Sequence, residues 1–277
     1  MKVSCSLPKL ALWCRMPSKW RPQCLNALYV ISDTHGRLQQ LNLILDRILP
    51  LRKSDGGKDR LIMLGDYIDR DPDSHLVIDK LIELKKKYKD KLILLRGNHE
   101  LMFLDGIKAS LSSDNYMFWM KNGGEQTLSG YLKRGGQPMD NPYVLPRPRI
   151  IDFIPKEHIE FIENELVDYY HFQDEMDEFF FAHAGFDTER RINNQQKHDL
   201  IWGNGLYTKV KEKANDPLPC TIVTGHYWDG PYITKNFMML DCYNRKELLA
   251  VELRSMEAYA AKPGYNRLLK VSLEDMA

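Results

Sequence analysis

The chain reads LIMLGDYIDR from Leu61 to Arg70, a run of four apolar residues followed at once by a glycine and a cluster of charged side chains. Short apolar runs that stop at a glycine are typical of buried strands that end in a turn. In open α/β sheets, the loops at the carboxyl ends of the strands carry the polar side chains that bind ligands. We therefore predict a strand at 61–64 whose end presents Asp66, Asp69 and Arg70 to a ligand-binding crevice.

Four further polar clusters follow apolar runs in the same way. They are Asp33-Thr34-His35, Arg96-Gly97-Asn98-His99-Glu100, His183-Ala184-Gly185 and Gly225-His226. Asp33, Asp66 and Asn98 lie 33 and 32 residues apart, which matches one strand-helix-strand unit of roughly 30 residues. We expect the five clusters to meet at the carboxyl ends of neighbouring strands.

The pattern between the clusters predicts an α/β fold. Apolar residues at helical spacing indicate helices at about 38–49 and from Asp73 or Ser74 to Tyr88, and closing strands are expected near 237–241 and 247–253. Residues 1–27 carry three prolines without sustained periodicity, which indicates a poorly ordered extension before one domain at 28–277. A mostly helical, cap-like insertion is expected at about 110–170.

The composition argues against two classes of partner. The 39 Lys and Arg residues nearly balance 38 Asp and Glu residues, so net charge gives no reason to expect nucleic acid or an anionic membrane. No apolar stretch reaches the roughly 18 residues that a membrane-spanning helix needs. The cysteines form no close-spaced metal pair and no even disulfide set, which favours reduced thiols in the cytoplasm; they are Cys5, Cys14, Cys24, Cys220 and Cys242.

Six side chains of the clusters suit a centre with two metal ions. Two carboxylates, one amide and three imidazoles, without a thiolate, are typical of hard-to-borderline dinuclear sites that hydrolyse phosphate esters. Such a site needs a ligand or hydroxide that touches both cations, and Asp66 is the predicted bridge. Asp33 and His35 are assigned to one cation, and Asn98, His183 and His226 to the other. The predicted nucleophile is a metal-bridged hydroxide.

The remaining charged residues of the clusters are predicted to act on the substrate. His99 follows Asn98 directly, and because adjacent side chains on a turn diverge, it is free to protonate the leaving oxygen as a general acid. Asp69 is the candidate to orient the imidazole of His99. The guanidinium of Arg70 matches the paired oxygens of a phosphate, and Arg96 is a weaker candidate for the same role.

These motifs resemble those of the metallophosphoesterases, and within them the phosphoprotein phosphatase branch, with its bacterial serine/threonine phosphatases and diadenosine tetraphosphatase-like enzymes. The similarity covers about 28–253 and rests on Asp-x-His-Gly, Gly-Asp-x-x-Asp-Arg, Gly-Asn-His-Glu, His-Ala-Gly and Gly-His. Residues 119–128 are also similar to a segment of the bacterial members. The resemblance implies a two-sheet β-sandwich flanked by helices, of the calcineurin-like type, with manganese as the expected metal and iron or zinc as alternatives.

Three positions depart from the family's pattern. Asp71 stands where glycine usually follows the arginine, and Asn204 lies where bacterial members often have arginine shortly after a tryptophan, here Trp202. Tyr227-Trp228 replaces the more usual Thr-Pro. The first two changes weaken the expected phosphate clamp. The aromatic pair favours a substrate with an aromatic ring, although aromatic residues at such places often only pack.

Three functions follow from this comparison. The first is a metal-dependent phosphatase acting on phosphoserine or phosphothreonine in proteins, which Tyr67 and Glu100 favour by resemblance. The second is a dinucleoside polyphosphate hydrolase, acting on diadenosine tetraphosphate with the same metals. The third is a phosphate-binding homologue that has lost catalysis. The expected partner is a phosphorylated protein or a nucleotide, with neither nucleic acid nor membrane.

Overall fold

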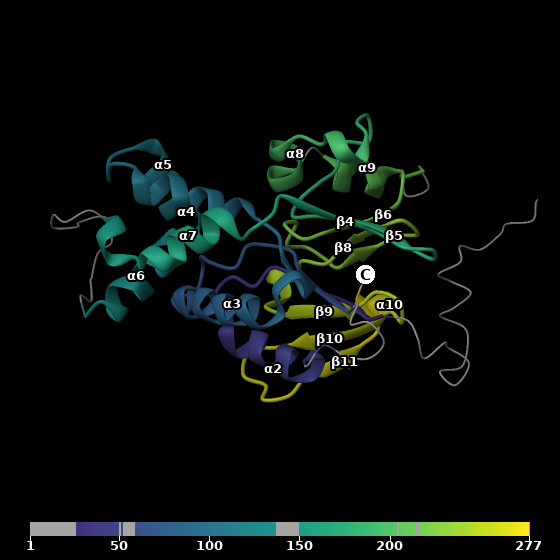
Figure 1. The fold of residues 1–277 in the computed structure, drawn as a ribbon, viewed down its shortest axis with the longest axis horizontal. Helices are drawn as coiled ribbons and strands as arrows, with labels where there is room; N and C mark the ends of the chain where they lie inside the picture. Colours follow the sequence, from purple (N-terminus) through teal and green to yellow (C-terminus); the bar gives the residue numbers. More distant parts are fainter. Residues whose placement is uncertain are drawn as a thin grey trace, which may run out of the picture.

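The computed structural model describes residues 26–49, 51, 59–136, 150–203, 205–213 and 217–276. Within them two β-sheets pack face to face, and helices cover the outer face of each sheet (Figure 1). Most of the N-terminal extension, the proline-rich part of the insertion at 137–149 and Asn204 lie outside the described residues.

The first sheet has six strands in the order β11-β10-β9-β1-β2-β3. β1 (Leu28–Ile31), β2 (Arg60–Met63) and β3 (Leu92–Leu94) are parallel and are joined by α2 (Leu38–Ile48) and α3 (Ser74–Tyr88). β9 (Leu248–Glu252) is antiparallel to β1, and β10 (Glu257–Ala261) and β11 (Leu269–Val271) extend the sheet with antiparallel pairings. The parallel half therefore directs three strand ends toward one edge.

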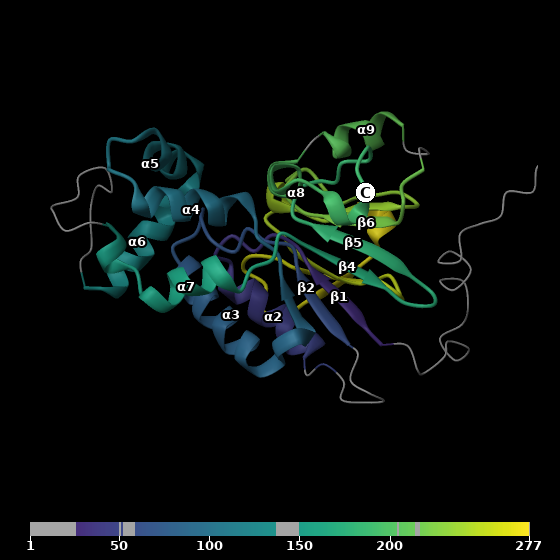
Figure 2. The same ribbon diagram turned by 45° about the horizontal axis from the view of Figure 1, so that its top comes forward.

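The second sheet has five strands in the order β4-β5-β6-β8-β7. β5 (Glu178–Ala182), β6 (Thr221–Thr224) and β8 (Phe237–Met239) are parallel, and the antiparallel strands β4 (Tyr169–Gln173) and β7 (Tyr232–Ile233) form its edges. α8 (Lys197–Trp202) and α9 (Leu206–Glu212) connect β5 to β6 and cover the outer face (Figures 1 and 2). Near the start of this sheet, Val167 pairs with Leu95 at the end of β3.

Side chains on alternate faces of the strands contribute to three separate layers of the hydrophobic core. Val30 and Ile62 from the first sheet meet Phe181 from the second in the middle of the sandwich. Their neighbour Ile31 faces α2 and α3 on the outer side, whereas Phe180 faces α8 and α9. Successive side chains of a strand point to opposite faces, so strands buried on both sides read as continuous apolar runs.

A group of helices lies at one end of the two sheets, beside the loops that follow the parallel strands (Figure 1). It contains α4 (Asn98–Lys108), α5 (Asp114–Trp119), a π-helical turn at Met120–Gly124, α6 (Glu125–Arg134) and α7 (Lys156–Asn164). Phe103, Tyr116, Trp119 and Tyr131 are fully buried inside it. The cap-like insertion predicted at about 110–170 includes these helices from α5 onward and ends at the start of β4.

The predicted fold class, a two-sheet sandwich flanked by helices, is confirmed. The strands expected near 237–241 and 247–253 correspond to β8 and β9. β4, β7, β10 and β11 were not predicted from the sequence. β4, β7 and β11 are edge strands with exposed or half-buried side chains, so they lack a buried apolar run. None of the described helices is long and apolar enough to cross a membrane.

Candidate metal centre

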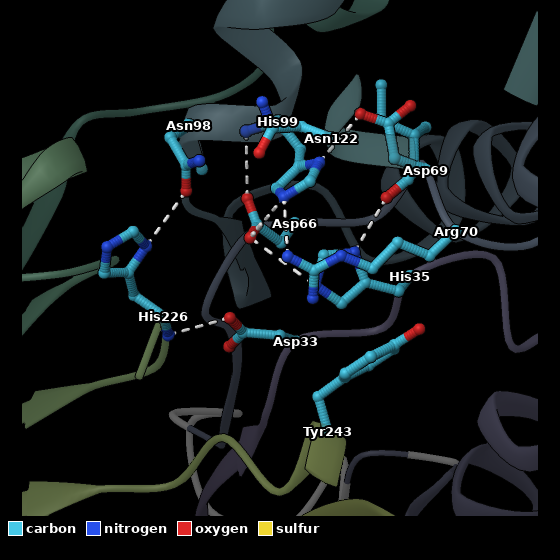
Figure 3. Close-up of polar contacts among 12 residues, drawn as sticks. Asp33, His35, Asp66, Asp69, Arg70, Asn98, His99, Asn122, His226 and Tyr243 are labelled. Atoms are coloured by element: carbon cyan, nitrogen blue, oxygen red, sulfur yellow. Dashed lines mark hydrogen bonds and ion pairs between the residues drawn. The ribbon is translucent and has the colours of Figure 1, made fainter. Parts of the chain in front are cut away.

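The five polar clusters meet where the two sheets direct their parallel strand ends toward each other. Asp33 and His35 follow β1, Asp66 follows β2, and Asn98 begins α4 immediately after β3. From the second sheet, His183 follows β5 and His226 follows β6. Figure 3 shows Asp33, Asp66, Asn98 and His226 directed toward a common centre.

The loops that carry these side chains have unusual backbone conformations. Of the eight described non-glycine residues with positive φ, five lie in the clusters. They are His35 (44°), Asp66 (49°), Asp69 (70°), Arg70 (68°) and His226 (70°). Non-glycine residues in the left-handed region are disfavoured and concentrate at functional sites, where surrounding contacts hold them. The loop geometry therefore supports a binding role for these clusters.

One group of ligand atoms surrounds a single point. The Oδ1 atom of Asn98 lies 3.0 Å from both His183 Nε2 and His226 Nδ1, and the two nitrogens are 3.2 Å apart. His183 Nε2 is also 3.4 Å from Asp66 Oδ1. Tetrahedral ligands with bonds of about 2.0–2.2 Å are separated by roughly 3.3–3.6 Å. The four atoms thus have nearly the mutual spacing of ligands to one cation.

In two of the imidazoles, a hydrogen bond of one ring nitrogen decides which nitrogen faces the centre. His183 Nδ1 donates to Leu64 O at 2.8 Å, and His35 Nδ1 donates to Ile68 O at 2.9 Å. Nε2 of each ring therefore faces the centre, as metal-binding histidines require.

A second group lies on the other side of Asp66. His35 Nε2 is 3.6 Å from Asp66 Oδ2, and His99 Nε2 is 3.8 Å from the same oxygen. Asp66 therefore belongs to two groups of possible metal ligands, one with His35 and His99 and one with His183 and His226. This sharing is the arrangement that a bridging carboxylate needs.

Asp33 is buried with one oxygen engaged and the other without a hydrogen-bond partner among the described residues. Its Oδ2 accepts from the backbone N–H of His226 at 2.8 Å, whereas Oδ1 has no partner. A buried, unsatisfied carboxylate oxygen is costly unless a proton or a cation compensates for it. Burial, and the nearby carboxylates of Asp241 and Asp66, raise the pKa of Asp33 well above its usual range.

Charge in the centre favours a cation. Burial alone would lower the pKa of His183, but Asp66 and Asp33 raise it to about 10. Burial alone would raise the pKa of Asp66, yet the surrounding histidines, His183 foremost, hold it well below its usual value. The carboxylates thus attract positive charge, and a metal ion would replace the proton on His183. The donor set fits two divalent ions.

Two glycines leave the space that the carboxylates occupy. A Cβ atom on Gly97 would lie less than 3.0 Å from Asp66 Oδ1, and one on Gly225 would lie equally close to Asp33 Oδ1. No larger residue can stand at either position without displacing a carboxylate. Gly97 and Gly225 therefore keep the backbone of both sheets close to the centre.

His99, Asp69 and Arg70 lie together beside the second group. His99 Nδ1 donates to Asp69 Oδ2 at 2.7 Å. Arg70 Nη2 is 3.1 Å from His99 Nε2, and Nη1 is 3.0 Å from His35 Nε2. Burial lowers the pKa of His99, but Asp66 and Asp69 outweigh it, so the pKa lies above the usual value. The predicted pairing of His99 with Asp69 is present in the structure, next to the arginine.

The structure directs Arg96 away from this centre, so its predicted contact with phosphate is corrected. Its Nη2 donates to the backbone oxygens of Glu163 and Leu166 at 3.1 and 2.8 Å, and its Nε lies 3.2 Å from Asp168 Oδ1. Arg96 follows β3 with its side chain toward the end of α7. It therefore joins α7 to the sheet instead of facing a substrate.

The departures from the family's pattern differ in their placement. Asp71 lines a cavity of about 380 Å³ beside Arg70 and His35, together with Tyr243 and Lys246. Tyr227 packs against Tyr207, with ring centroids 4.8 Å apart, so it is a packing residue. Trp228 is 53% exposed, and the guanidinium of Arg70 lies 5.5 Å from its ring centroid. Asn204 lies outside the described residues.

Glu100 has a role that the sequence analysis did not identify. Its buried carboxylate accepts from the backbone N–H groups of Asp66, Tyr67 and Gly97 at 3.0, 2.8 and 2.8 Å. It therefore ties the loop after β2 to the loop after β3. The signal in the sequence was its place as the third residue of α4, a position from which a glutamate side chain reaches back to free backbone donors.

Comparisons with known proteins agree with this geometry. A family model described as calcineurin-like phosphoesterase matches residues 27–242. A symmetrical bis(5'-nucleosyl)-tetraphosphatase of Pseudomonas fluorescens is 36% identical over 78 residues, 28% of this chain and 25% of the relative. Serine/threonine-protein phosphatase 1 of Salmonella typhimurium is 34% identical over 98 residues, 35% of this chain and 39% of the relative. The chain thus spans well under half the length of these relatives.

A solved structure of a cold-active protein tyrosine phosphatase shares the fold, with a TM-score of 0.50 and 16% identity. The alignment covers 90% of this chain and 79% of that one.

Asp66→Asn should abolish stabilisation by metal. At about 100 times the Kd, a ligand of the folded state adds about 2.7 kcal/mol, which raises the Tm of a protein this size by about 5 °C or more. We expect Mn²⁺ to raise the Tm of the wild type in this way and to leave that of Asp66→Asn unchanged. Asp105→Asn, on the exposed side of α4, is the matched control and should respond like the wild type. An unaltered response of Asp66→Asn would contradict the bridging role.

In the absence of metal ions, Glu100→Gln should lower the free energy of unfolding. The amide offers one acceptor in place of two, so at least one buried N–H loses its partner, at a cost of about 1–3 kcal/mol. Urea unfolding followed by circular dichroism measures the difference, with the exposed Glu212→Gln on α9 as control. Equal stability of the two variants would show that Glu100 does not hold the loops.

Proposed function

Because the chain belongs to the calcineurin-like phosphoesterase family, we propose that it is a metal-dependent phosphatase that hydrolyses phosphate monoesters of serine and threonine in proteins. The observation that carries this proposal is the position of Asp66 between His35, from the first sheet, and His183 and His226, from the second. We thus propose both a general activity, hydrolysis of phosphoric esters, and a specific one, dephosphorylation of proteins.

Six residues would hold the two cations. We assign Asp33 and His35 to one, Asn98, His183 and His226 to the other, and Asp66 to both. Manganese fits the mixture of oxygen and imidazole ligands, with iron or zinc as alternatives. When bound, such a pair of ions polarises the phosphoryl group and activates water as the nucleophile.

His99 is the proposed general acid. Its Nδ1–H is held by Asp69 at 2.7 Å, which fixes the ring with Nε2 toward the centre. The proton on Nε2 would pass to the leaving oxygen of serine or threonine as the bond to phosphorus breaks. Asp69 favours the protonated imidazole, because the carboxylate is buried directly behind the ring and cannot be screened by water.

Arg70 is the proposed phosphate-binding residue. Its guanidinium lies between the Nε2 atoms of His35 and His99, and the ring of Tyr243 stacks on it at 4.5 Å from the centroid. The planar fork can donate two parallel hydrogen bonds to phosphate oxygens beside the metal centre. A cation–π contact on one face limits the motion of the fork. Each Nη atom has a second N–H beside the one directed at a histidine, and these two N–H groups are the proposed phosphate donors.

A dinucleoside polyphosphate hydrolase is the second candidate, and the position of Trp228 favours it. The exposed ring lies next to Arg70, where a nucleobase attached to the phosphate chain can stack. The adjoining cavity, lined by Tyr243 and Lys246, offers an aromatic ring and a cation to the remainder of a nucleotide. The third alternative, an inactive phosphate-binding homologue, is less favoured, because the six proposed ligands and the His99–Asp69 pair are intact.

Cytoplasmic location is part of the proposal. Cys220 and Cys242 are free and buried, as expected for a protein in a reducing compartment. A phosphorylated protein or a nucleotide is the proposed partner, and neither nucleic acid nor membrane binding is proposed.

With Mn²⁺, we expect the protein to hydrolyse phenyl phosphate, an aryl ester whose basic phenolate leaving group gains from protonation. His99→Ala should lower kcat for this ester by about a hundredfold or more, the usual scale for loss of a general acid. His198→Ala removes an imidazole that is 75% exposed and should retain wild-type turnover. Full turnover by metal-loaded His99→Ala would remove His99 from the mechanism.

A comparison of the two substrates on the same enzyme preparation distinguishes the two candidate functions. One manganese-loaded sample is given a phosphoserine peptide or diadenosine tetraphosphate, and kcat/KM is measured for each. We expect the peptide to be preferred; preference for the nucleotide would establish the second candidate instead. Trp228→Ala adds a structural test, since it should selectively lower the kcat/KM of the nucleotide if the base stacks on this ring.

A further inference from the structure

The helical insertion contributes two side chains to the carboxylate behind the proposed general acid. Trp119 at the end of α5 and Thr127 in α6 both contact Asp69, 50 and 58 residues away along the chain. Both are fully buried. Among the described residues, no hydrogen bond joins either side chain to a proposed metal ligand, so both lie behind the proposed reacting groups.

Among the described residues, three donors make the polar contacts of the Asp69 carboxylate. Trp119 Nε1 lies 3.0 Å from Oδ1 and 3.2 Å from Oδ2, and Thr127 Oγ1 lies 2.8 Å from Oδ1. His99 Nδ1 takes the remaining position on Oδ2 at 2.7 Å. Since Asp69 is completely buried, these donors replace the water that would otherwise solvate it. They also fix the plane of the carboxylate and hence the direction of its bond to His99.

The same insertion holds the backbone of this loop. Thr127 Oγ1 accepts from the N–H of Asp69 at 2.8 Å, so one hydroxyl both donates to and accepts from the same residue. The next N–H, that of Arg70, donates to Gly123 O at 2.9 Å. Asp69 and Arg70 are consecutive non-glycine residues in the left-handed region, with φ of 70° and 68°. Such a conformation persists only when contacts outweigh its cost, and here the insertion supplies them.

Close packing holds the indole ring of Trp119 in one orientation. Phe103 packs edge-on against it, with centroids 5.5 Å apart. A Cβ atom on Gly106 would lie 2.6 Å from its Cε3, and one on Gly124 would lie less than 3.0 Å from its Nε1. The two glycines thus allow the indole to reach Asp69, and the close packing prevents it from turning away.

From these contacts we propose that Trp119 and Thr127 are positioning residues, which fix Asp69 behind His99 and hold the loop of Arg70 in its left-handed form. The proposal rests on the proposed function, because it assigns the insertion a part in protonating the leaving group. A purely structural role would affect stability alone. A positioning role lowers kcat most for substrates whose leaving group must be protonated as it departs.

Thr127→Val removes both hydrogen bonds of the hydroxyl and keeps a branched side chain, whereas Thr127→Ser keeps both bonds. We expect Thr127→Val to lower kcat about tenfold for a phosphate ester with a poor leaving group such as an alkoxide, with KM little changed. With an activated leaving group such as dinitrophenolate, which needs little protonation, the loss should be about twofold or less. Thr127→Ser should restore the wild-type ratio of the two rates.

Gly124→Ala tests Trp119 without altering it. The backbone of Gly124 is helical, with φ of −64°, so alanine is acceptable there except for its collision with the indole. We expect the same dependence on the leaving group as for Thr127→Val. Gly135→Ala is the matched control, since the nearest atom to an added Cβ is 3.5 Å away, and Tyr131→Phe removes a hydroxyl from α6 that bonds to His158 instead of Asp69. Both controls should behave like the wild type.

Amide hydrogen exchange gives a readout that does not depend on activity. Thr127→Val should raise the exchange rate of the Asp69 amide about tenfold, while Thr127→Ser should not. Two results would overturn the positioning role even if phosphatase activity is found. One is that folded Thr127→Val and Gly124→Ala show the wild-type ratio of kcat for the two kinds of leaving group. The other is that the exchange rate of the Asp69 amide is unchanged in Thr127→Val. If the wild type hydrolyses no phosphate ester with Mn²⁺, the proposed function fails, and the exchange measurement alone decides whether the insertion holds this loop.

Discussion

Asp66 is 2% exposed, and its carboxylate lies among imidazoles from both sheets. The rest of the structure depends on compensating this buried charge. A carboxylate away from water is tolerated only with compensating positive charge or hydrogen bonds. His35 and His99 approach it from one side, and His183 from the other. The two sheets must therefore keep their parallel strand ends together, because a shift of either would leave the charge uncompensated.

The fold meets this requirement with close backbone approach and a few buried ties. Gly97 and Gly225 allow the loops of the two sheets to approach the carboxylates, and Glu100 binds the loops after β2 and β3 through three N–H groups. The insertion supports the next loop through Thr127 and Gly123. Each of these hydrogen-bonded contacts holds a loop in a conformation that would otherwise relax to a less strained one. Hydrogen bonds from neighbouring backbone and side chains thus hold the residues of the proposed site in place.

Much of the fold and of the site could be predicted from sequence, because parallel strands give a simple local signal. A short apolar run followed by a polar cluster indicates a buried strand with a ligand loop, and regular spacing placed Asp33, Asp66 and Asn98 on one edge. Arg96 belongs to such a cluster, but the direction of its side chain depends on α7, which lies some 60 residues later. The contacts of Trp119 and Thr127 with Asp69 likewise join distant segments, so no local pattern could assign them. β4 and β11 were missed because edge strands bury little apolar surface.

Anomalous diffraction from crystals grown with Mn²⁺ tests the central claim most directly. We predict two peaks, about 3.5 to 4 Å apart, one on each side of Asp66. One should lie within bonding distance of Asp33 and His35, and the other within bonding distance of Asn98, His183 and His226. A map with no peak at Asp66, or with manganese bound only elsewhere, would contradict the account.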